Sequence, residues 1–591
     1  MNFLYIISII CLMTLFLLYR KSDKEICFVS SLFYSFGLLF CYNTVIVFLI
    51  YLLGIQGSIL LYSIINYFIG TIILLIILRK KKIQKYCFDK KKLIVIFCVI
   101  VIVFLIGCFR YRGFEAISYE SGDSAIHYTH AIKFSEELSI LDENNSNDYV
   151  YGYFDRVMPI SYVNCGFLFN ILSGVKTYIL FGYYNVFCLI LSAIIFLITV
   201  MDLFNTKKKN YVFSIILTLF YLLAYPFNAF IMGFCYLGLN LMVINMIFLT
   251  FIHIRDNLTD KMIFKVIIIF LLTFGCFYSY YLFVPAVYLM IGIYYIYLWR
   301  NKKINFKELL IYGIFTLVIP FIIGFSYFLI TWVIDSGYSN ITTVLASWGY
   351  SYNNITPLYL FIFISTCYVC MLFKKKKING FKISMSVISI YVALFLILYI
   401  FKITDSYYFY KIFSLYWLAI VLFFYEYIFK FRKIFYVFCF IMLGINIFVY
   451  NDSSSKFAIF MINSNIYTWN SIMMIDENII FDENEVEIME ESIKYQDQCM
   501  NNDNYKFLVL GDVLKNIWYY SVTKTVPVLG NVKDNKHNLY LNLVPDVTSW
   551  YYGMKEYNCL VYYYEDEKVE LNESMIEILY SNDSGAIIKR K

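Results

Sequence analysis

The stretch LIVIFCVIVIVFLIGCF, residues 93–109, contains no charged side chain. A helix needs about 20 apolar residues to cross the hydrocarbon core of a bilayer, and this run approaches that length. Comparable apolar runs recur along the first 450 residues. The whole 591-residue chain is 61% hydrophobic and 15% charged, with a mean hydropathy of +0.69. This composition is typical of a membrane protein and predicts a mostly α-helical, polytopic transmembrane bundle.

The same length criterion, applied along the chain, predicts about fourteen spans. The expected spans are 2–19, 28–53, 57–78, 93–109, 177–200, 211–231, 234–253, 263–279, 281–299, 308–332, 357–373, 383–402, 410–429 and 434–450. The first run has no basic segment before it and no small-residue cleavage site after it. We therefore expect it to be a retained span and not a signal peptide.

Lysine and arginine concentrate in alternate loops of this arrangement. Examples are RKKKIQK (79–85), RNKK (300–303) and KKKK (374–377), whereas the loop at 333–356 contains neither residue type. Because positively charged loops stay in the cytoplasm, the N-terminus is predicted to lie outside. The large loop 110–176 and everything after residue 450 are then also predicted to be extracytoplasmic.

Residues 451–591 have a different composition from the rest of the chain. They contain the acidic helical stretch DENEVEIMEESIKYQ (482–496) and β-like runs such as KFLVLGD (506–512) and NCLVYYYED (558–566). The mixture predicts two domains, a transmembrane domain 1–450 and a small extracytoplasmic α/β domain 451–591. Cys499 and Cys559 lie in the second domain and can form a disulfide if that domain faces an oxidising compartment.

The outer loop contains the polar stretch YESGDSAIHYTHAIKF, residues 119–134. Asp123 and His127 are four residues apart, so a helix would present both on one side, with His130 one turn further. A carboxylate at the edge of the membrane can accept a proton from an incoming hydroxyl, which makes Asp123 a candidate general base. Its alternative role is structural, because Asp before a helix is a favoured N-cap.

Glu115 and Glu120 are the other acids near Asp123. Together these carboxylates have the oxygen ligands that a divalent cation prefers, although no DxD-type pair is present. We expect no cofactor, and a divalent cation stays the alternative. Glu120 and His130 are also candidates for substrate binding.

A second polar cluster lies at KITDSYYFYKIFSLYW, residues 402–417. Lys411 would be a cation at the outer interface, where a lipid phosphate also lies. Tyr407 and Tyr408 can stack on sugar or lipid, as can Tyr281 in the outer turn FYSYYLFVPA (277–286). The alternative is an interfacial belt, in which lysine extends to the surface and tyrosine anchors the helix.

The arrangement resembles the GT-C superfamily of glycosyltransferases. Those are polytopic enzymes that use polyprenyl-phosphate-linked sugars, and their first outer loop typically contains the catalytic Asp and then a Pro-containing segment. Asp123 matches the acid, and Pro159 in RVMPISYVNCGFLFNIL (156–172) matches the later segment. The resemblance implies Asp123 as general base, Lys411 at the donor phosphate, His127 supporting one of them, and inversion at the anomeric carbon. This chain places about three spans before the one that leads into the acidic loop, whereas the better-known members place one.

We therefore expect a membrane glycosyltransferase of the cell envelope. It would move a sugar from a polyprenyl-phosphate donor to a surface glycan or lipid-linked acceptor on the outer face. A lipid-linked polysaccharide polymerase or ligase is an alternative, but the loop 333–356 lacks the arginines it would be expected to present. A flippase or transporter is another, but the spans hold almost no ionisable residue near mid-bilayer. Nucleic acid is not expected as a partner, because the basic residues lie in short loops between spans.

Overall fold

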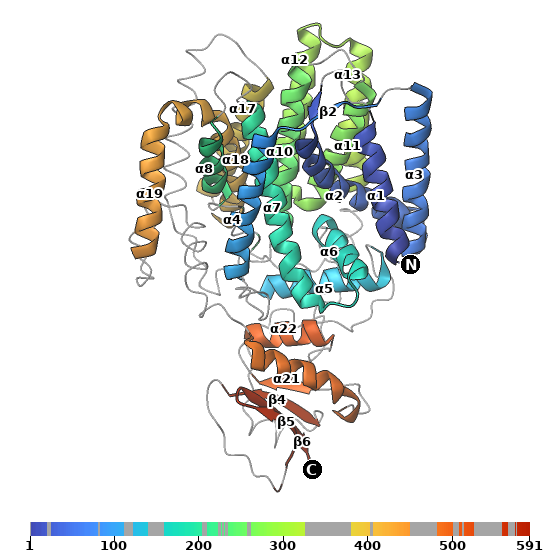
Figure 1. Ribbon diagram of the computed structural model, residues 1–591, viewed down its shortest axis with the longest axis vertical. Coiled ribbons are helices and arrows are strands. Elements are labelled where there is room, and N and C mark those ends of the chain that lie inside the picture. The colour runs from blue at the N-terminus through green and yellow to red at the C-terminus, as the bar shows by residue number, and fades with distance from the viewer. Residues whose placement is uncertain are drawn as a thin grey trace.

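The structure is a computed structural model of the chain. It describes residues 2–19, 25–80, 83–110, 122–139, 159–203, 210–222, 226, 230, 235–256, 262–325, 380–401, 406–448, 481–499, 507–510, 513–524, 558–564, 574 and 576–591. Most of them are helical and form one large bundle, with a smaller unit of helices and strands below one end of it (Figure 1).

The bundle consists mainly of long apolar helices. They are α1 (Asn2–Leu18), α2 (Phe28–Leu52), α3 (Ile59–Lys80), α4 (Lys90–Arg110), α7 (Thr177–Leu203), α8 (Tyr211–Leu222), α10 (Cys235–Asp256), α11 (Met262–Ser279), α12 (Val284–Arg300), α13 (Phe306–Gly313), α17 (Gly380–Ile400), α18 (Ser406–Lys430) and α19 (Arg432–Phe448). Each expected span coincides with a helix over its described part, and the span expected at 357–373 lies outside the described residues. Within the described ranges, six helices are long and apolar enough to cross a membrane.

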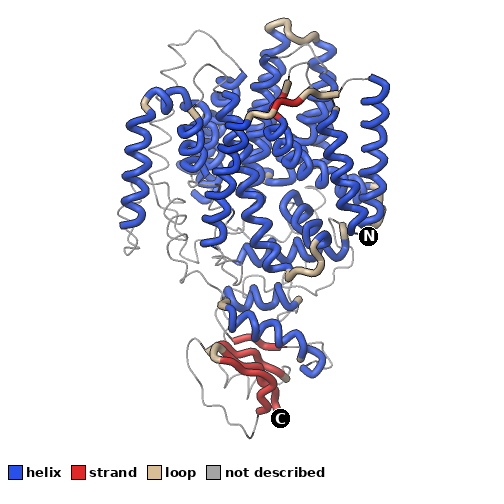
Figure 2. The backbone as a smooth tube through the Cα atoms, viewed as in Figure 1, coloured by secondary structure: helices blue, strands red, loops and turns tan. Residues whose placement is uncertain are grey.

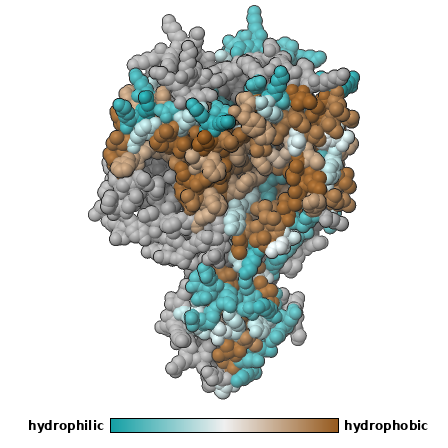
Figure 3. Space-filling model, in the orientation of Figure 1, coloured by the Kyte–Doolittle hydropathy of each residue, from teal (hydrophilic) through white to brown (hydrophobic). Residues whose placement is uncertain are grey.

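Burial separates inner helices from outer ones. Helices α7 and α10 are buried along most of their length, whereas α3 and α19 expose Ile, Leu and Phe side chains. Figure 3 shows these hydrophobic side chains in brown over the bundle, with hydrophilic side chains in teal at its upper rim and on the smaller unit. Apolar side chains on the outside of a bundle are stable when lipid surrounds them, because lipid tails are as apolar as the side chains.

The two ends of the bundle differ in charge as the loop pattern predicts. At the upper end of Figure 1, the short strand β1 (Ile26–Cys27) pairs in parallel with β2 (Tyr86–Cys87), next to two lysine-rich loops. The turn between α12 and α13, with Lys302 and Lys303, lies at the same end. The described parts of the first large loop, residues 122–139 and 159–176, and the smaller unit lie at the opposite end. Which end faces outward stays a prediction.

The smaller unit, residues 481–591 as described, is called the C-terminal unit below. Its elements are α21 (Glu483–Lys494), the 3₁₀ turn Gln496–Cys499, β3 (Phe507–Leu510), α22 (Val513–Thr523), β4 (Cys559–Tyr563), β5 (Ile576–Asn582) and β6 (Gly585–Arg590). The sheet order is β3-β4-β6-β5, parallel between β3 and β4 and antiparallel elsewhere (Figure 2). A domain boundary at residue 450 stays a prediction.

Three contacts hold the C-terminal unit together. Cys499 forms a disulfide with Cys559, which joins the end of the 3₁₀ turn to β4. A buried ion pair between Lys515 and Glu485 joins α22 to α21, and Glu485 also completes a capping box at the start of α21. A buried ion pair has little net effect on stability by itself, but removing one partner leaves a costly unpaired charge.

Candidate active site

Helices α5 (Gly122–Glu137) and α6 (Pro159–Ile171) lie across the lower end of the bundle (Figure 1). The backbone of Asp123 belongs to the first turn of α5, where a carboxylate also interacts favourably with the helix dipole. Glu115 and Glu120 lie outside the described residues, and so does the side chain of Asp123. Tyr407 and Tyr408 belong to the first turn of α18, and their side chains likewise lie outside the described residues.

A glycine allows α5 and α6 to approach closely. A Cβ atom at Gly166 would lie 2.5 Å from the Phe134 ring and 2.8 Å from the Ala131 carbonyl oxygen. Asn164 then ties α6 to α2, since its Nδ2 donates to the Phe40 carbonyl oxygen at 3.2 Å. Helix α5 is thereby held against the bundle through α6.

Four residues meet on the bundle side of α5, and we call them the Lys411 cluster: His127, Tyr236, Tyr280 and Lys411. The Lys411 Nζ donates to the Tyr236 hydroxyl at 3.4 Å and lies 5.3 Å from the centre of the Tyr280 ring. The His127 and Tyr236 rings are 5.1 Å apart, edge to face. The cluster therefore joins α5, α10, α18 and the turn that follows α11.

The cation of the cluster belongs to Lys411 and not to His127. Burial lowers the pKa of His127 to about 3, and the nearby His130 and Lys411 add to the effect. The imidazole is thus neutral at neutral pH, when it can donate one hydrogen bond and accept another. Placing a neutral imidazole beside an ammonium group avoids repulsion between two buried positive charges.

The other predicted residues lie beside the cluster or face away from it. Tyr281 is next to it, since its ring lies 5.7 Å from that of Tyr280. His130 faces α6, where its ring lies 5.4 Å from that of Tyr162. Burial lowers the pKa of His130 to about 3, with Lys133 as the second cause. The structure therefore brings His127, Lys411 and Tyr281 into one region and directs His130 toward a neighbouring one.

Two residues of this region were not among the candidates selected from the sequence. Tyr236 lies in the first turn of α10 and contacts both His127 and Lys411. Asn240, one turn further along α10 and fully buried, donates to the Tyr280 carbonyl oxygen at 2.9 Å. The sequence signal for Asn240 was an asparagine inside a mostly apolar span. A buried amide in a membrane helix requires a hydrogen-bonding partner.

Within the described ranges, no three His, Cys, Asp or Glu side chains gather as a metal site would require. The chemistry that these residues support is binding of an anion at Lys411, next to hydroxyl, imidazole and aromatic groups.

Comparison with known proteins gives one structural similarity to report. The chain matches no family model and no curated protein sequence. Among solved structures, it is similar to ArnT from Cupriavidus metallidurans bound to undecaprenyl phosphate. The two share 10% sequence identity, the match covers 84% of this chain and 97% of that one, and the TM-score is 0.42. We base the functional proposal on the residues of this chain.

Proposed function

We propose that this chain is a GT-C-type membrane glycosyltransferase that acts on the outer face of the cell membrane. The donor would be a polyprenyl-phosphate-linked sugar, and the acceptor a surface glycan or a lipid-linked precursor. The observation that carries this proposal is the Lys411 cluster, a cation among tyrosines that packs on the helix containing Asp123.

Lys411 is proposed to bind the phosphate of the donor. Its Nζ donates to Tyr236, whose ring contacts His127 of α5, and its side chain is partly exposed. An ammonium group stabilises the negative charge that grows on a departing phosphate, and this effect is strongest where water is scarce. The Tyr236 hydroxyl can donate a hydrogen bond to the same phosphate, while the Tyr280 and Tyr281 rings offer apolar faces to sugar or lipid.

Asp123 is proposed to be the general base. It precedes His127 by four residues, which corresponds to about 6 Å along the helix. In the proposed step its carboxylate accepts the proton of an acceptor hydroxyl, whose oxygen then attacks the anomeric carbon. The bond from that carbon to the phosphate oxygen breaks, polyprenyl phosphate leaves with the electron pair, and the configuration inverts. His127, neutral beside Lys411, is proposed to orient the hydroxyl or the phosphate.

The proposed location follows from charge and cysteine chemistry. The turn between α12 and α13, with Lys302 and Lys303, lies at the end opposite to α5, and positive loops stay in the cytoplasm. The Cys499–Cys559 pair favours the same orientation, because disulfides persist in oxidising compartments. We therefore propose that the N-terminus and the C-terminal unit are extracytoplasmic.

The test is Asp123→Asn in cells, with surface glycan composition as the readout. We expect the glycan product to be lost while the protein accumulates normally, because an amide cannot accept the proton. Asp583→Asn is the matched control, since Asp583 is exposed in the turn between β5 and β6. An unchanged glycan at normal protein levels would remove Asp123 from the mechanism.

A further inference from the structure

We propose that the C-terminal unit is a clamp that positions helix α5, with Trp518 as its central contact. Helix α22 packs directly on α5 (Figure 1). Trp518 is fully buried there, and its ring lies 5.6 Å from that of Tyr128 on α5 and 6.4 Å from that of Phe181 on α7. A buried tryptophan at the centre of a contact typically contributes more to it than any surrounding polar pair.

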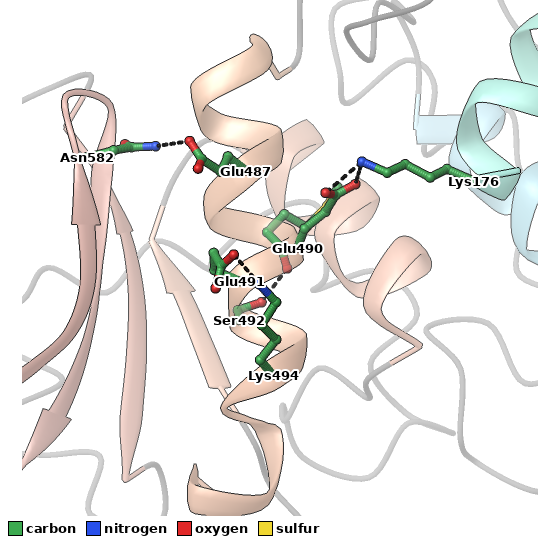
Figure 4. Close-up of polar contacts among 8 residues, drawn as sticks. Lys176, Glu487, Glu490, Glu491, Ser492, Lys494 and Asn582 are labelled. Atoms are coloured by element: carbon green, nitrogen blue, oxygen red, sulfur yellow. Dashed lines mark hydrogen bonds and ion pairs between the residues drawn. The ribbon is translucent and has the colours of Figure 1, made fainter.

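Two ion pairs flank the Trp518 contact. Glu490 of α21 pairs with Lys176 at 2.5 Å (Figure 4). It also accepts a hydrogen bond from the Tyr178 hydroxyl at 2.6 Å. Lys524, just after α22, pairs with Glu136 near the end of α5. Exposed ion pairs contribute little free energy. These pairs therefore determine how the unit is oriented on α5, while the ring contact supplies most of the attraction.

The clamp contacts α5 on a different face from the Lys411 cluster. Tyr128 faces Trp518, and its hydroxyl forms a 2.7 Å hydrogen bond with the Thr177 hydroxyl. The adjacent His127 faces Tyr236 of the bundle. Neighbouring residues of a helix point about 100° apart, so α5 is held between two surfaces. A shift of α5 at Trp518 would consequently displace the His127 imidazole.

Several contacts within the C-terminal unit hold Trp518 in place. Three residues before Trp518, Lys515 makes the buried ion pair with Glu485. One residue after it, the Tyr519 hydroxyl makes a 2.6 Å hydrogen bond with Ser492 of α21. The disulfide fixes the end of the 3₁₀ turn to the sheet. These contacts fix α22, and with it Trp518, within the C-terminal unit.

The effect of the clamp on catalysis rests on the proposed function, whereas the clamp itself does not. If α5 contains the general base, loosening α5 lowers turnover. Lys411 and Tyr236, the proposed phosphate-binding residues, lie on α18 and α10 and would keep their positions.

The experiment is hydrogen exchange of the full-length chain in lipid nanodiscs, followed over residues 122–139. We expect Trp518→Ala to raise exchange in this segment about tenfold or more, because truncating a buried aromatic side chain is strongly destabilising. Trp518→Phe should restore most of the protection. Exchange in α12 and α17 should not change. Trp299→Ala is the control, since Trp299 is partly exposed at the opposite end of the bundle.

A second variant distinguishes loss of the clamp from unfolding of the C-terminal unit. Glu490→Ala with Lys524→Ala removes the flanking pairs and leaves Trp518 in place, so a smaller rise confined to α5 and residues 176–178 is expected. The clamp is overturned if residues 122–139 keep their protection in Trp518→Ala, whether or not the C-terminal unit loosens. It is also overturned if the double variant leaves both segments unchanged.

Activity separates the clamp from the proposed function. With a polyprenyl-phosphate sugar as donor, Trp518→Ala should lower kcat about tenfold and leave the donor KM within about twofold, since the donor-binding residues do not move. Trp518→Phe should recover kcat. If Asp123→Asn leaves the glycan intact while Trp518→Ala loosens α5, the glycosyltransferase proposal fails and the clamp stands.

Discussion

Lys411 lies among aromatic side chains near one end of α18. Its Nζ lies 5.3 Å from the Tyr280 ring and 5.9 Å from the Tyr236 ring. Such contacts contribute about 0.5–2 kcal/mol each and do not neutralise the ammonium. Ionisable residues in membrane helices are costly and usually mark a functional site. At the scale of residues, the Lys411 cluster is the strongest indication of function in this chain.

Replacing Lys411 by methionine should weaken donor binding while keeping the shape of the side chain. A hydrogen bond to a charged group contributes about 1.5–3 kcal/mol, so Lys411→Met should raise the donor KM about 10- to 100-fold. The measurement is steady-state kinetics with donor as the varied substrate. Lys430→Met, at the far end of the same helix and exposed, should leave KM unchanged. Equal KM values for the two variants would exclude Lys411 from phosphate binding.

At the scale of elements, the contact between α5 and α6 determines where the candidate residues of α5 lie. The Phe134 and Phe167 rings are 5.2 Å apart, and Gly166 leaves room for both Phe134 and the Ala131 carbonyl. Because glycine has no Cβ, Gly166 lets the two helix backbones approach closely. Helix α5 also packs against α22, through Tyr128 and Trp518.

Gly166→Ala should push these two helices apart. The added Cβ would lie 2.8 Å from a backbone oxygen, which cannot rotate away as a side chain can. Overpacking of this kind costs about 1–3 kcal/mol, so we expect a lower Tm in detergent. Gly174→Ala is the matched control because a Cβ there has nothing within 4 Å. If both variants melt alike, the close approach at Gly166 is not needed for stability.

The whole molecule is polarised along the axis of the bundle. The turn with Lys302 and Lys303 lies at one end, while α5, α6 and the C-terminal unit lie at the other (Figure 1). A belt of hydrophobic side chains separates the two ends (Figure 3). A lipid-linked donor confined to one leaflet would therefore meet Lys411 at one end only.

Cysteine labelling of intact cells tests this polarity. Asp583→Cys, in the turn between β5 and β6, should react with a membrane-impermeant maleimide. Lys302→Cys, in the turn between α12 and α13, should react only after the cells are lysed. The parent chain with its native cysteines measures background labelling. The reverse pattern would place the Lys411 cluster on the cytoplasmic side and contradict the proposed orientation.

The sequence selected three residues that the structure places in one region, and their roles stay a prediction. His127, Lys411 and Tyr281 were selected from two polar stretches and an aromatic turn, and they occupy one region of the structure. Tyr236 was missed because one tyrosine at the end of a span looks like any other interfacial tyrosine. His130 was selected with His127 on helical spacing, but a separation of three residues also allowed it to face α6.

By itself, the sequence determined where the apolar helices lie and where the composition changes after residue 450, and it predicted how the helices alternate across the membrane. These features are local, because lipid requires a continuous apolar run for each helix, and loop charge is read one loop at a time. Only the tertiary structure decided that Tyr236 joins His127 and Lys411, that Gly166 faces Phe134, and that Trp518 packs on Tyr128. The partners in the first and last of these contacts lie more than 100 residues apart. Their meeting depends on how whole helices pack, and no local pattern encodes that.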